Sequence, residues 1–327
     1  MLRAAVICGL GGYEPEAIVT NDMLAEELDT SDEWIRTRTG VGQRHIAGAH
    51  QSTGDLAIEA AARALSSAGL TQVDAVVLAT ATPDFSCPAT APRVAARLGM
   101  SGVMAFDISA VCTGFVYGLA VASSLITAGV VHSVLLIGAD TFTRTLDPGD
   151  RSTRALFGDG AGAVVLRSGD SAEPGALLGF DLGSDGSLAG LLMTPAVTHE
   201  ERANQQSTSF FSMDGRAVFN EAVNHMTESV QQILKAVGWE VRDVDRLVPH
   251  QANTRILAAV ADQLDIPFER VVSNLSEVGN TVAASIPLAL VYGHGAGSLQ
   301  EGDRVVLTGF GAGLTWGSVA LRWPRIV

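Results

Sequence analysis

The sequence is poor in basic residues, and above all in lysine. Lys235 is the only lysine among 327 residues, and 21 Lys and Arg stand against 35 Asp and Glu, so the formal net charge is −14. Nucleic-acid binding needs positive charge clustered against the phosphates, which excludes nucleic acid as a partner. Only 17% of the residues are charged and 47% are hydrophobic. That composition predicts one large folded core or two ordinary ones.

Cysteine is also scarce. Cys8, Cys87 and Cys112 are widely spaced, which matches neither a disulfide framework nor a metal-ligand signature. The sequence therefore predicts no metal site and a protein of the reducing cytoplasm. The N-terminal run MLRAAVICGLGG lacks the pattern of a cleavable signal, and we expect a first buried strand there.

One long stretch lacks charge altogether. Residues 108–139 contain no Asp, Glu, Lys or Arg, a length that would suffice for a membrane span of about 20 residues. Gly, Ser, Thr and His interrupt it, however. We expect a buried helix over about 114–128 and a buried strand over 133–137 instead, and no membrane association.

Short runs rich in Val, Ile and Leu alternate with Ala-rich runs along the chain. The strand-like runs include AVVLAT, VMAFDI, SVLLIG and GAVVLR in the first half, and DRLVPH, RVVLTG and SVALRW in the second. Between them lie helical segments such as DLAIEAAARALSSAG and NEAVNHMTESVQQILKAVG. This alternation predicts an α/β fold with a largely parallel sheet covered on both faces.

The chain also contains a weak internal repeat. SVLLIGADT at 133–141 resembles RVVLTGFGA at 304–312, and FGDGAGAVVL resembles FGAGLTWGSVAL. The offset is about half the chain, far longer than the period of about 20–50 residues typical of solenoids. We expect two duplicated halves, 1–172 and 173–327, that meet in the Gly-, Ser-, Asp- and Pro-containing segment 168–175. Ligands of open α/β sheets bind beyond the carboxyl ends of the strands, so the chemistry should lie there.

Cys112 is the first candidate for that chemistry. It follows VMAFDI and precedes a helix that we expect to begin at Thr113–Gly114. The positive end of a helix dipole lowers a thiol pKa and favours the nucleophilic thiolate. Most free cysteines are nevertheless small buried hydrophobes, so position alone leaves both interpretations open.

Three further features lie in the second half, two of them at the ends of strand-like runs and one in a loop before an uncharged helix. His250 lies in VPHQAN and Asn280 in GNTVAAS. An imidazole and an amide can donate to a developing oxyanion, although a satisfied loop histidine and a helix N-cap are the alternatives. The run GFGAGLTWG at 309–317 matches neither a dinucleotide fingerprint nor a phosphate loop. It favours a close backbone approach and a backbone N–H for an oxyanion.

These motifs together resemble the β-ketoacyl-acyl-carrier-protein synthase III family, the initiating condensing enzymes. AVCTGF, VPHQAN, GNTVAAS and GFGAGLTWG stand in the family's order and spacing, and TSDEWIRTRTGVGQRHIA and DRSTRALFGDGAGAVVL also resemble it. The similarity covers about residues 3–323. It implies a thiolase-like, layered αβαβα fold, usually a homodimer, that takes acyl-CoA and malonyl-acyl-carrier protein as substrates and needs no cofactor.

The resemblance assigns the catalytic set to Cys112, His250 and Asn280. The Cys112 thiolate would attack an acyl-CoA primer while the backbone N–H groups of Cys112 and Ala312 bind the oxyanion. His250 and Asn280 would then stabilise the enolate that forms as the malonyl group loses CO₂. Attack of this enolate on acyl-Cys112 would give a 3-oxoacyl-carrier protein, the first product of fatty-acid or polyketide synthesis.

The same match implies a CoA site. Trp34 and Arg151 resemble the pair that sandwiches the adenine, and Arg38 resembles a nucleotide-contacting arginine. Thr39 would lie beside them, and Asn253 would line the path of the pantetheine.

Two departures from the family pattern matter. The family often has a bulky aromatic in the segment matching 84–88, where it reaches across the dimer to close the primer pocket, and here Cys87 stands there. A smaller residue predicts a primer larger than acetyl, from propionyl to medium or branched chains. Arg255 matches a docking arginine for the acidic carrier protein, but the helix after it carries Asp262 and Asp265 in place of lysines. We therefore expect a weaker or displaced docking patch.

Other protein classes share part of this pattern. Papain-like proteases also use Cys, His and Asn, but they place the cysteine beside a Trp near the N-terminus and usually contain disulfides. Type III polyketide synthases and hydroxymethylglutaryl-CoA synthases are closer, and the latter would need an extra carboxylic acid, for which Glu277 is the nearest candidate. A catalytically silent subunit is disfavoured because all three reactive positions are filled.

Overall fold

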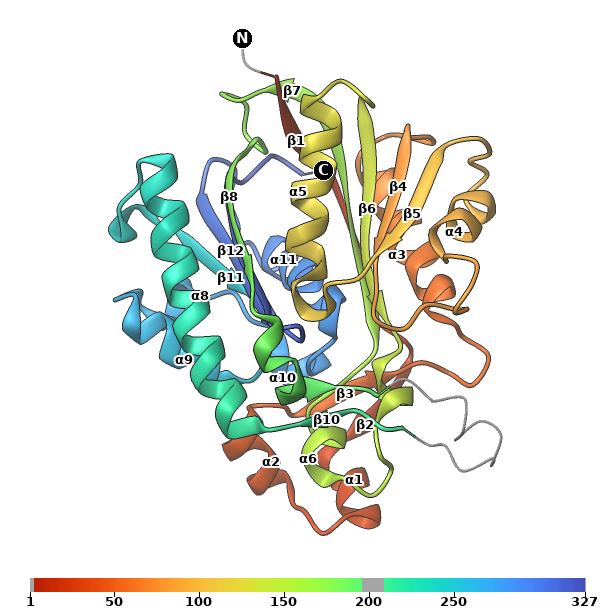
Figure 1. The fold of residues 1–327 in the computed structure, drawn as a ribbon, viewed down its shortest axis with the longest axis vertical. Helices are drawn as coiled ribbons and strands as arrows, with labels where there is room; N and C mark the ends of the chain where they lie inside the picture. Colours follow the sequence, from red (N-terminus) through yellow and green to blue (C-terminus); the bar gives the residue numbers. More distant parts are fainter. Residues whose placement is uncertain (1–2, 196–208, 327) are drawn as a thin grey trace.

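The structure is a computed structural model that describes residues 3–195 and 209–326. Two sheets carry the fold (Figure 1). The first has the strand order β1-β7-β6-β4-β5. Its strands are β1 (Arg3–Tyr13), β4 (Ala75–Ala79), β5 (Met104–Ile108), β6 (Ser133–Asp140) and β7 (Gly160–Asp170). The second has the order β11-β12-β13-β8. Its strands are β8 (Leu177–Ser184), β11 (Arg246–Pro249), β12 (Arg304–Gly311) and β13 (Thr315–Arg322).

Helices form three layers around these sheets. They are α3 (Thr53–Ser67), α4 (Ala91–Arg97), α5 (Gly114–Thr127), α8 (Gly215–Val237), α9 (Thr254–Gln263) and α11 (Ser285–Gly295). Helices α3 and α4 pack on the first sheet, α5 and α11 lie between the two sheets, and α8 covers the second sheet together with its neighbour α9 (Figure 1). The result is the predicted αβαβα layering.

The two sheets repeat one strand pattern, which confirms the predicted duplication. The parallel pair β4–β6 is continued by antiparallel β7 and β1, and the parallel pair β11–β12 by antiparallel β13 and β8. The prediction of a largely parallel sheet was wrong. Strand β6 pairs antiparallel with β7, and β12 pairs antiparallel with β13, and an antiparallel pair needs no crossover helix. Strand β7 ends at Asp170 and β8 begins at Leu177; the domain boundary at 172/173 itself stays a prediction.

Burial between the sheets explains the uncharged stretch of the sequence. Helix α5 and the strand β6 match the predicted buried helix and strand closely, and Phe115, Leu119 and Ile126 of α5 are fully enclosed. A helix with sheets on two sides has no face for charged residues. Among the described residues, no helix is long and apolar enough to span a membrane.

Smaller elements surround one end of the sheets. They are β2 (Ala17–Thr20), β3 (Gln43–Ile46), β9 (Leu192–Met193), β10 (Ser212–Met213), α1 (Asn21–Glu27), α2 (Asp32–Thr39), α6 (Arg151–Arg154) and α10 (Leu275–Val278). Short 3₁₀ turns η1 (Val111–Thr113), η2 (Phe142–Thr145) and η6 (Val282–Ala284) complete this region. Figure 1 shows most of these small elements gathered at the lower end of the molecule.

Candidate active site

Cys112 lies in η1, directly before the central helix α5. The preceding Val111 has a left-handed backbone with φ 47°, a conformation that costs a β-branched residue strain energy and occurs mostly at functional sites. Gly311 at the end of β12 lies against this turn. A Cβ on Gly311 would come within 2.9 Å of the Cys112 Cβ, so glycine is required for the approach. The close backbone contact predicted for the glycine-rich run therefore exists, and it is made to the cysteine.

His250 follows the last residue of β11, where its backbone N–H donates to the Thr308 carbonyl at 2.7 Å. Its ring Nδ1 lies 2.5 Å from the Ser285 Oγ at the start of α11. Burial lowers the pKa of His250 to about 3, so the imidazole is neutral near pH 7. A Ser285 hydroxyl that donates to Nδ1 leaves the ring proton on Nε2, which makes this nitrogen a donor. The sequence interpretation missed Ser285, although it closes the GNTVAAS run.

Asn280 lies two residues before the turn η6, which leads into α11 as η1 leads into α5. Its backbone is held on both sides, with its N–H donating to Leu156 and its carbonyl accepting from Gly158. Its side-chain Oδ1 accepts from the Val282 N–H at 3.0 Å. This is a local side-chain-to-backbone bond and not the helix N-cap of the alternative interpretation, because Thr281 and Ala284 are the cap residues of η6 and α11. The bond leaves the amide Nδ2 as the group that can donate to a ligand.

These residues meet in one cavity of about 80 Å³. Cys112, His250, Asn280 and Ala312 all line it, although the chain separates them widely. The remaining wall is almost entirely apolar. It is formed by Val111, Phe142, Leu156, Phe157, Leu192, Phe211, Met213, Gly215, Val218, Ala222, Met226, Ala252, Asn253, Ile256, Phe310 and Gly311.

Three phenylalanines pack together in this wall. The ring centroids of Phe142, Phe157 and Phe211 are 4.9–5.4 Å apart, in tilted and edge-to-face contacts. They come from η2, the segment after α6 and the segment before β10. No local pattern in the sequence marks them, because only the tertiary structure brings the three segments together.

The resting thiol differs from the sequence expectation. Burial raises the pKa of Cys112 well above its usual range, and the Asp140 carboxylate raises it further. The predicted lowering by a helix N-terminus is therefore wrong for the free protein, because desolvation of a thiolate outweighs the dipole.

The buried carboxylate of Asp140 accepts hydrogen bonds from both halves of the chain. Its Oδ1 accepts from the Thr80 and Thr82 hydroxyls and the Ala81 N–H, and its Oδ2 accepts from the Ala283 N–H. The contact to Ala283 fixes the turn η6 that follows Asn280. Burial nevertheless raises the pKa of Asp140 to about 6, despite these donors.

We expect Asp140→Asn to lower the pKa of Cys112, because the substitution removes a negative charge that disfavours the thiolate. The rate of Cys112 alkylation by iodoacetamide, measured against pH, should shift to lower pH. The difference from wild type should appear above about pH 6, where Asp140 is ionised in the folded protein. Asp159→Asn is the matched control, since Asp159 is also buried and bonded by Ala47 and Thr143; an equal shift there would contradict the assignment.

The residues predicted for CoA lie together in a hollow of about 520 Å³ beside the cavity. Trp34, Arg38, Thr39 and Asn253 line it, and the Arg151 guanidinium carbon lies 4.9 Å from the centre of the Trp34 ring. Four residues line both the hollow and the Cys112 cavity, so the two adjoin. They are Leu156, Met213, Gly215 and Asn253.

Two predicted site residues remain, and they lie in different places. Arg255 lines the same hollow, with its guanidinium carbon 5.7 Å from the Phe219 ring centre. Cys87 is exposed and is not among the residues that line the Cys112 cavity.

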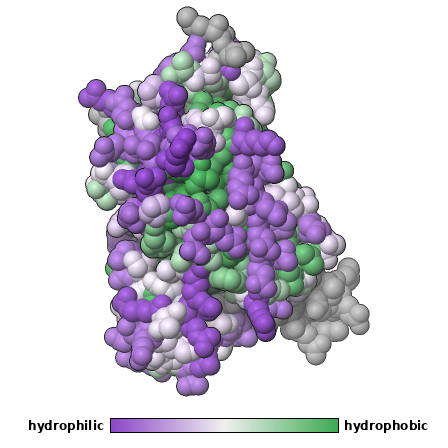
Figure 2. All heavy atoms as spheres, turned by 90° about the vertical axis from the view of Figure 1, so that its left-hand side faces the viewer, coloured by the Kyte–Doolittle hydropathy of each residue, from purple (hydrophilic) through white to green (hydrophobic). Residues whose placement is uncertain are grey.

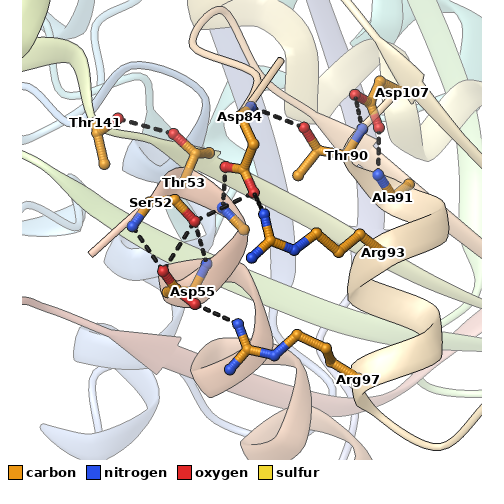
Figure 3. Close-up of polar contacts among 11 residues, drawn as sticks. Ser52, Thr53, Asp55, Asp84, Thr90, Ala91, Arg93, Arg97, Asp107 and Thr141 are labelled. Atoms are coloured by element: carbon orange, nitrogen blue, oxygen red, sulfur yellow. Dashed lines mark hydrogen bonds and ion pairs between the residues drawn. The ribbon is translucent and has the colours of Figure 1, made fainter. Parts of the chain in front are cut away.

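The loop that carries Cys87 is held firmly at both ends (Figure 3). The Asp84 carboxylate accepts from the Gly54 N–H at the start of α3, and the Asp84 N–H donates to Thr90. Asp107 accepts from the Thr90 and Ala91 N–H groups. The ends of the Cys87 loop are therefore fixed, and within one chain Cys87 does not reach the Cys112 cavity.

Known proteins share both the sequence and this architecture. The family described as 3-oxoacyl-[acyl-carrier-protein (ACP)] synthase III matches residues 106–186, and its C-terminal family matches residues 234–323. β-Ketoacyl-[acyl-carrier-protein] synthase III of Pseudomonas aeruginosa PAO1 is 69% identical over 327 residues, which are 100% of this chain and 99% of the relative. A Streptomyces coelicolor enzyme named β-ketoacyl-[acyl-carrier-protein] synthase III 5 is 58% identical over 100% of this chain and 99% of its own.

Solved structures of relatives have the same fold. The crystal structure of 3-oxoacyl-(acyl carrier protein) synthase III from P. aeruginosa PAO1 superimposes with a TM-score of 0.96 at 68% identity, covering 99% of each chain. The fold and the cavity thus define a thiolase-fold condensing enzyme, an acyltransferase. Within that class, the chain belongs to the β-ketoacyl-[acyl-carrier-protein] synthase III family.

Proposed function

We propose that this enzyme forms an acyl-thioester on Cys112 and condenses it with malonyl-acyl-carrier protein. The observation that carries the proposal is the convergence of Cys112, His250, Asn280 and Ala312 on one apolar cavity. A nucleophile, two neutral hydrogen-bond donors and a backbone N–H suit a reaction in which charge develops on a single carbonyl oxygen.

The first half-reaction is acyl transfer from CoA. The Cys112 sulfur attacks the thioester carbonyl, the N–H groups of Cys112 and Ala312 receive the oxyanion, and CoA leaves as the thiol with the proton of Cys112. The adenine of CoA would lie against Trp34 and Arg151, and its pantetheine would pass Asn253 toward the cavity. The residues that hollow and cavity share support this path.

The second half-reaction forms the carbon–carbon bond. Malonyl-carrier protein loses CO₂, and the electron pair of the broken bond becomes an enolate whose oxygen receives hydrogen bonds from His250 Nε2 and Asn280 Nδ2. The enolate carbon attacks acyl-Cys112, and the sulfur leaves as thiolate. A neutral imidazole is the form that this role needs, and burial provides it.

We further propose a primer larger than acetyl. The small Cys87 supports a range from propionyl to medium or branched chains, if the loop of a second copy faces the site in a homodimer. The cavity of about 80 Å³ limits the size of the primer further. Its small volume and apolar wall favour short, branched aliphatic primers. Such a primer suits the first step of fatty-acid or polyketide synthesis in the cytoplasm.

Intact-mass spectrometry tests both parts of this proposal. We expect the protein, after incubation with single acyl-CoAs, to gain one acyl mass that peptide mapping places on Cys112. Isobutyryl-CoA should acylate several-fold faster than acetyl-CoA, and hexanoyl-CoA more slowly than isobutyryl-CoA. A clear preference for acetyl-CoA would contradict the primer assignment, and an acyl group on another residue would contradict the mechanism.

A further inference from the structure

A buried arginine lies behind the CoA clamp, the pair Trp34 and Arg151 to which the adenine is assigned above. Arg44 of β3 is fully enclosed, and in the described part of the chain its hydrogen bonds all go to neutral groups. Burial lowers the pKa of Arg44 to about 10, so the guanidinium is still charged near pH 7. A buried cation held in this way contributes little net stability, but its charge-assisted hydrogen bonds fix the groups that they reach.

Asn21 connects this guanidinium to helix α2. The buried Asn21 side chain accepts from Arg44 Nη2 at 2.7 Å through its Oδ1. Its Nδ2 donates to the Asp32 Oδ1 at 2.7 Å and to the Val41 carbonyl at 2.9 Å. Asp32 is the first residue of α2, and Val41 lies two residues beyond its end. One amide therefore holds both ends of the helix that carries Trp34.

The same guanidinium also reaches helix α6. Arg44 Nη2 donates at 2.8 Å to the carbonyl of Ala155, the C-cap residue of α6. Helix α6 begins with Arg151, whose guanidinium carbon lies 4.9 Å from the Trp34 ring centre. One buried guanidinium and one buried amide thus join the two helices from which the clamp is built.

The other polar links described between α6 and the α1–α2 segment are made by solvent-accessible side chains. Arg154 binds Glu27 at 2.8 Å, and Arg151 lies 3.3 Å from the Asp29 carboxylate. The surface at this lower end of the molecule is mostly hydrophilic (Figure 2), and ion pairs in water contribute little. An adenine that enters the clamp must also move the Arg151 side chain off the Trp34 ring. The buried link is therefore the one that can keep the helices in place while the adenine binds.

We propose that Asn21 and Arg44 are positioning residues of the CoA clamp, which hold α2 and α6 at the spacing that the adenine needs. This role rests on the function proposed above, in which acyl-CoA is the primer. Neither residue lines the hollow or the Cys112 cavity, so both act through the helices rather than on the substrate. A substrate that lacks the nucleotide should not depend on them.

Asn21→Ala tests this role, because it removes the link to α2 alone, whereas a change at Arg44 would also release the Val19 and Ala155 carbonyls. The rate of Cys112 acylation is measured by mass against the concentration of the acyl-CoA that the wild type prefers among acetyl-, isobutyryl- and hexanoyl-CoA. We expect the half-saturating concentration to rise roughly three- to tenfold, the range of one weakened stacking contact, with little change in the maximal rate. The pantetheine thioester of the same acyl group, which lacks the nucleotide, should serve the variant as well as the wild type.

A double variant separates the contact itself from general stability. Asn21→Asp keeps the acceptor for Arg44 but sets two carboxylates against each other at Asp32, so we expect it to resemble Asn21→Ala. Adding Asp32→Asn restores a donor and an acceptor to this contact with their roles reversed. The double variant should therefore recover part of the affinity for acyl-CoA.

Arg246→Gln is the control for the loss of partly buried polar bonds. The Arg246 Nε donates to the Ser298 carbonyl at 2.5 Å, and its Nη1 donates to the Asp245 carbonyl at 3.2 Å. These bonds lie at the start of β11, outside both helices of the clamp. The half-saturating concentrations for acyl-CoA and for the pantetheine thioester should be those of the wild type.

An unchanged half-saturating concentration of acyl-CoA in Asn21→Ala would overturn the inference. An equal rise for the pantetheine thioester would overturn it too, since it would indicate a general disturbance of the cavity. The wild type shows whether the proposed function itself holds. Absence of an acyl adduct on its Cys112 would count against the mechanism, and equal use of acyl-CoA and the pantetheine thioester would count against the clamp and the inference with it. A normal adduct and a clear preference for acyl-CoA in the wild type, with no change in Asn21→Ala, would count against Asn21 and Arg44 alone.

Discussion

Replacing Cys112 by alanine should abolish the acyl adduct and reduce condensation by on the order of 10³-fold or more, the effect expected when a covalent nucleophile is lost. No other thiol can take its place. Cys8 is half-buried against the Val165 carbonyl, and Cys87 is exposed outside the cavity. Intact mass after incubation with the preferred acyl-CoA, together with the rate of 3-oxoacyl-carrier protein formation, measures both effects.

The Cys112→Ala variant also separates the two half-reactions. Decarboxylation of malonyl-carrier protein needs only His250 and Asn280, so CO₂ release should continue in the variant without carbon–carbon bond formation. That residual reaction shows that the variant is folded. Cys87→Ala is the paired control and should retain the adduct on Cys112. A full acyl adduct in Cys112→Ala would refute the assignment of the nucleophile.

Replacing His250 by alanine should lower the rate of condensation by roughly 10²–10³-fold, the loss typical of one oxyanion donor. Acylation of Cys112 should fall far less, because the backbone N–H groups of Cys112 and Ala312 serve that step. The two rates can be separated by measuring acylation by mass under single-turnover conditions and then adding malonyl-carrier protein to the acylated enzyme.

The partners of His250 provide graded controls for this experiment. Ser285→Ala removes the hydroxyl 2.5 Å from Nδ1 but keeps the imidazole, and we expect a smaller loss, confined to condensation, because the ring proton is no longer directed to Nε2. Asn280→Ala should resemble His250→Ala. If His250→Ala slowed acylation as much as condensation, the imidazole would instead be the proton acceptor for the buried thiol of Cys112.

The features that the sequence determined by itself are those that depend on neighbouring residues. Strand and helix runs, the uncharged segment that became α5 and β6, and the duplication of the halves could all be predicted, because hydrophobic pattern and repeat are local properties of the chain. The motifs around Cys112, His250 and Asn280 likewise carried the family resemblance, and with it the αβαβα layering and the class of reaction.

Only the tertiary structure decided the remaining features, because they depend on which segments meet. Packing between two sheets desolvates Cys112 and places Asp140 near it, so burial reverses the thiol pKa shift that a helix start alone predicts. The antiparallel pairings of β7 and β13, the three-phenylalanine wall and the contact of Ser285 with His250 likewise join segments that are distant in sequence.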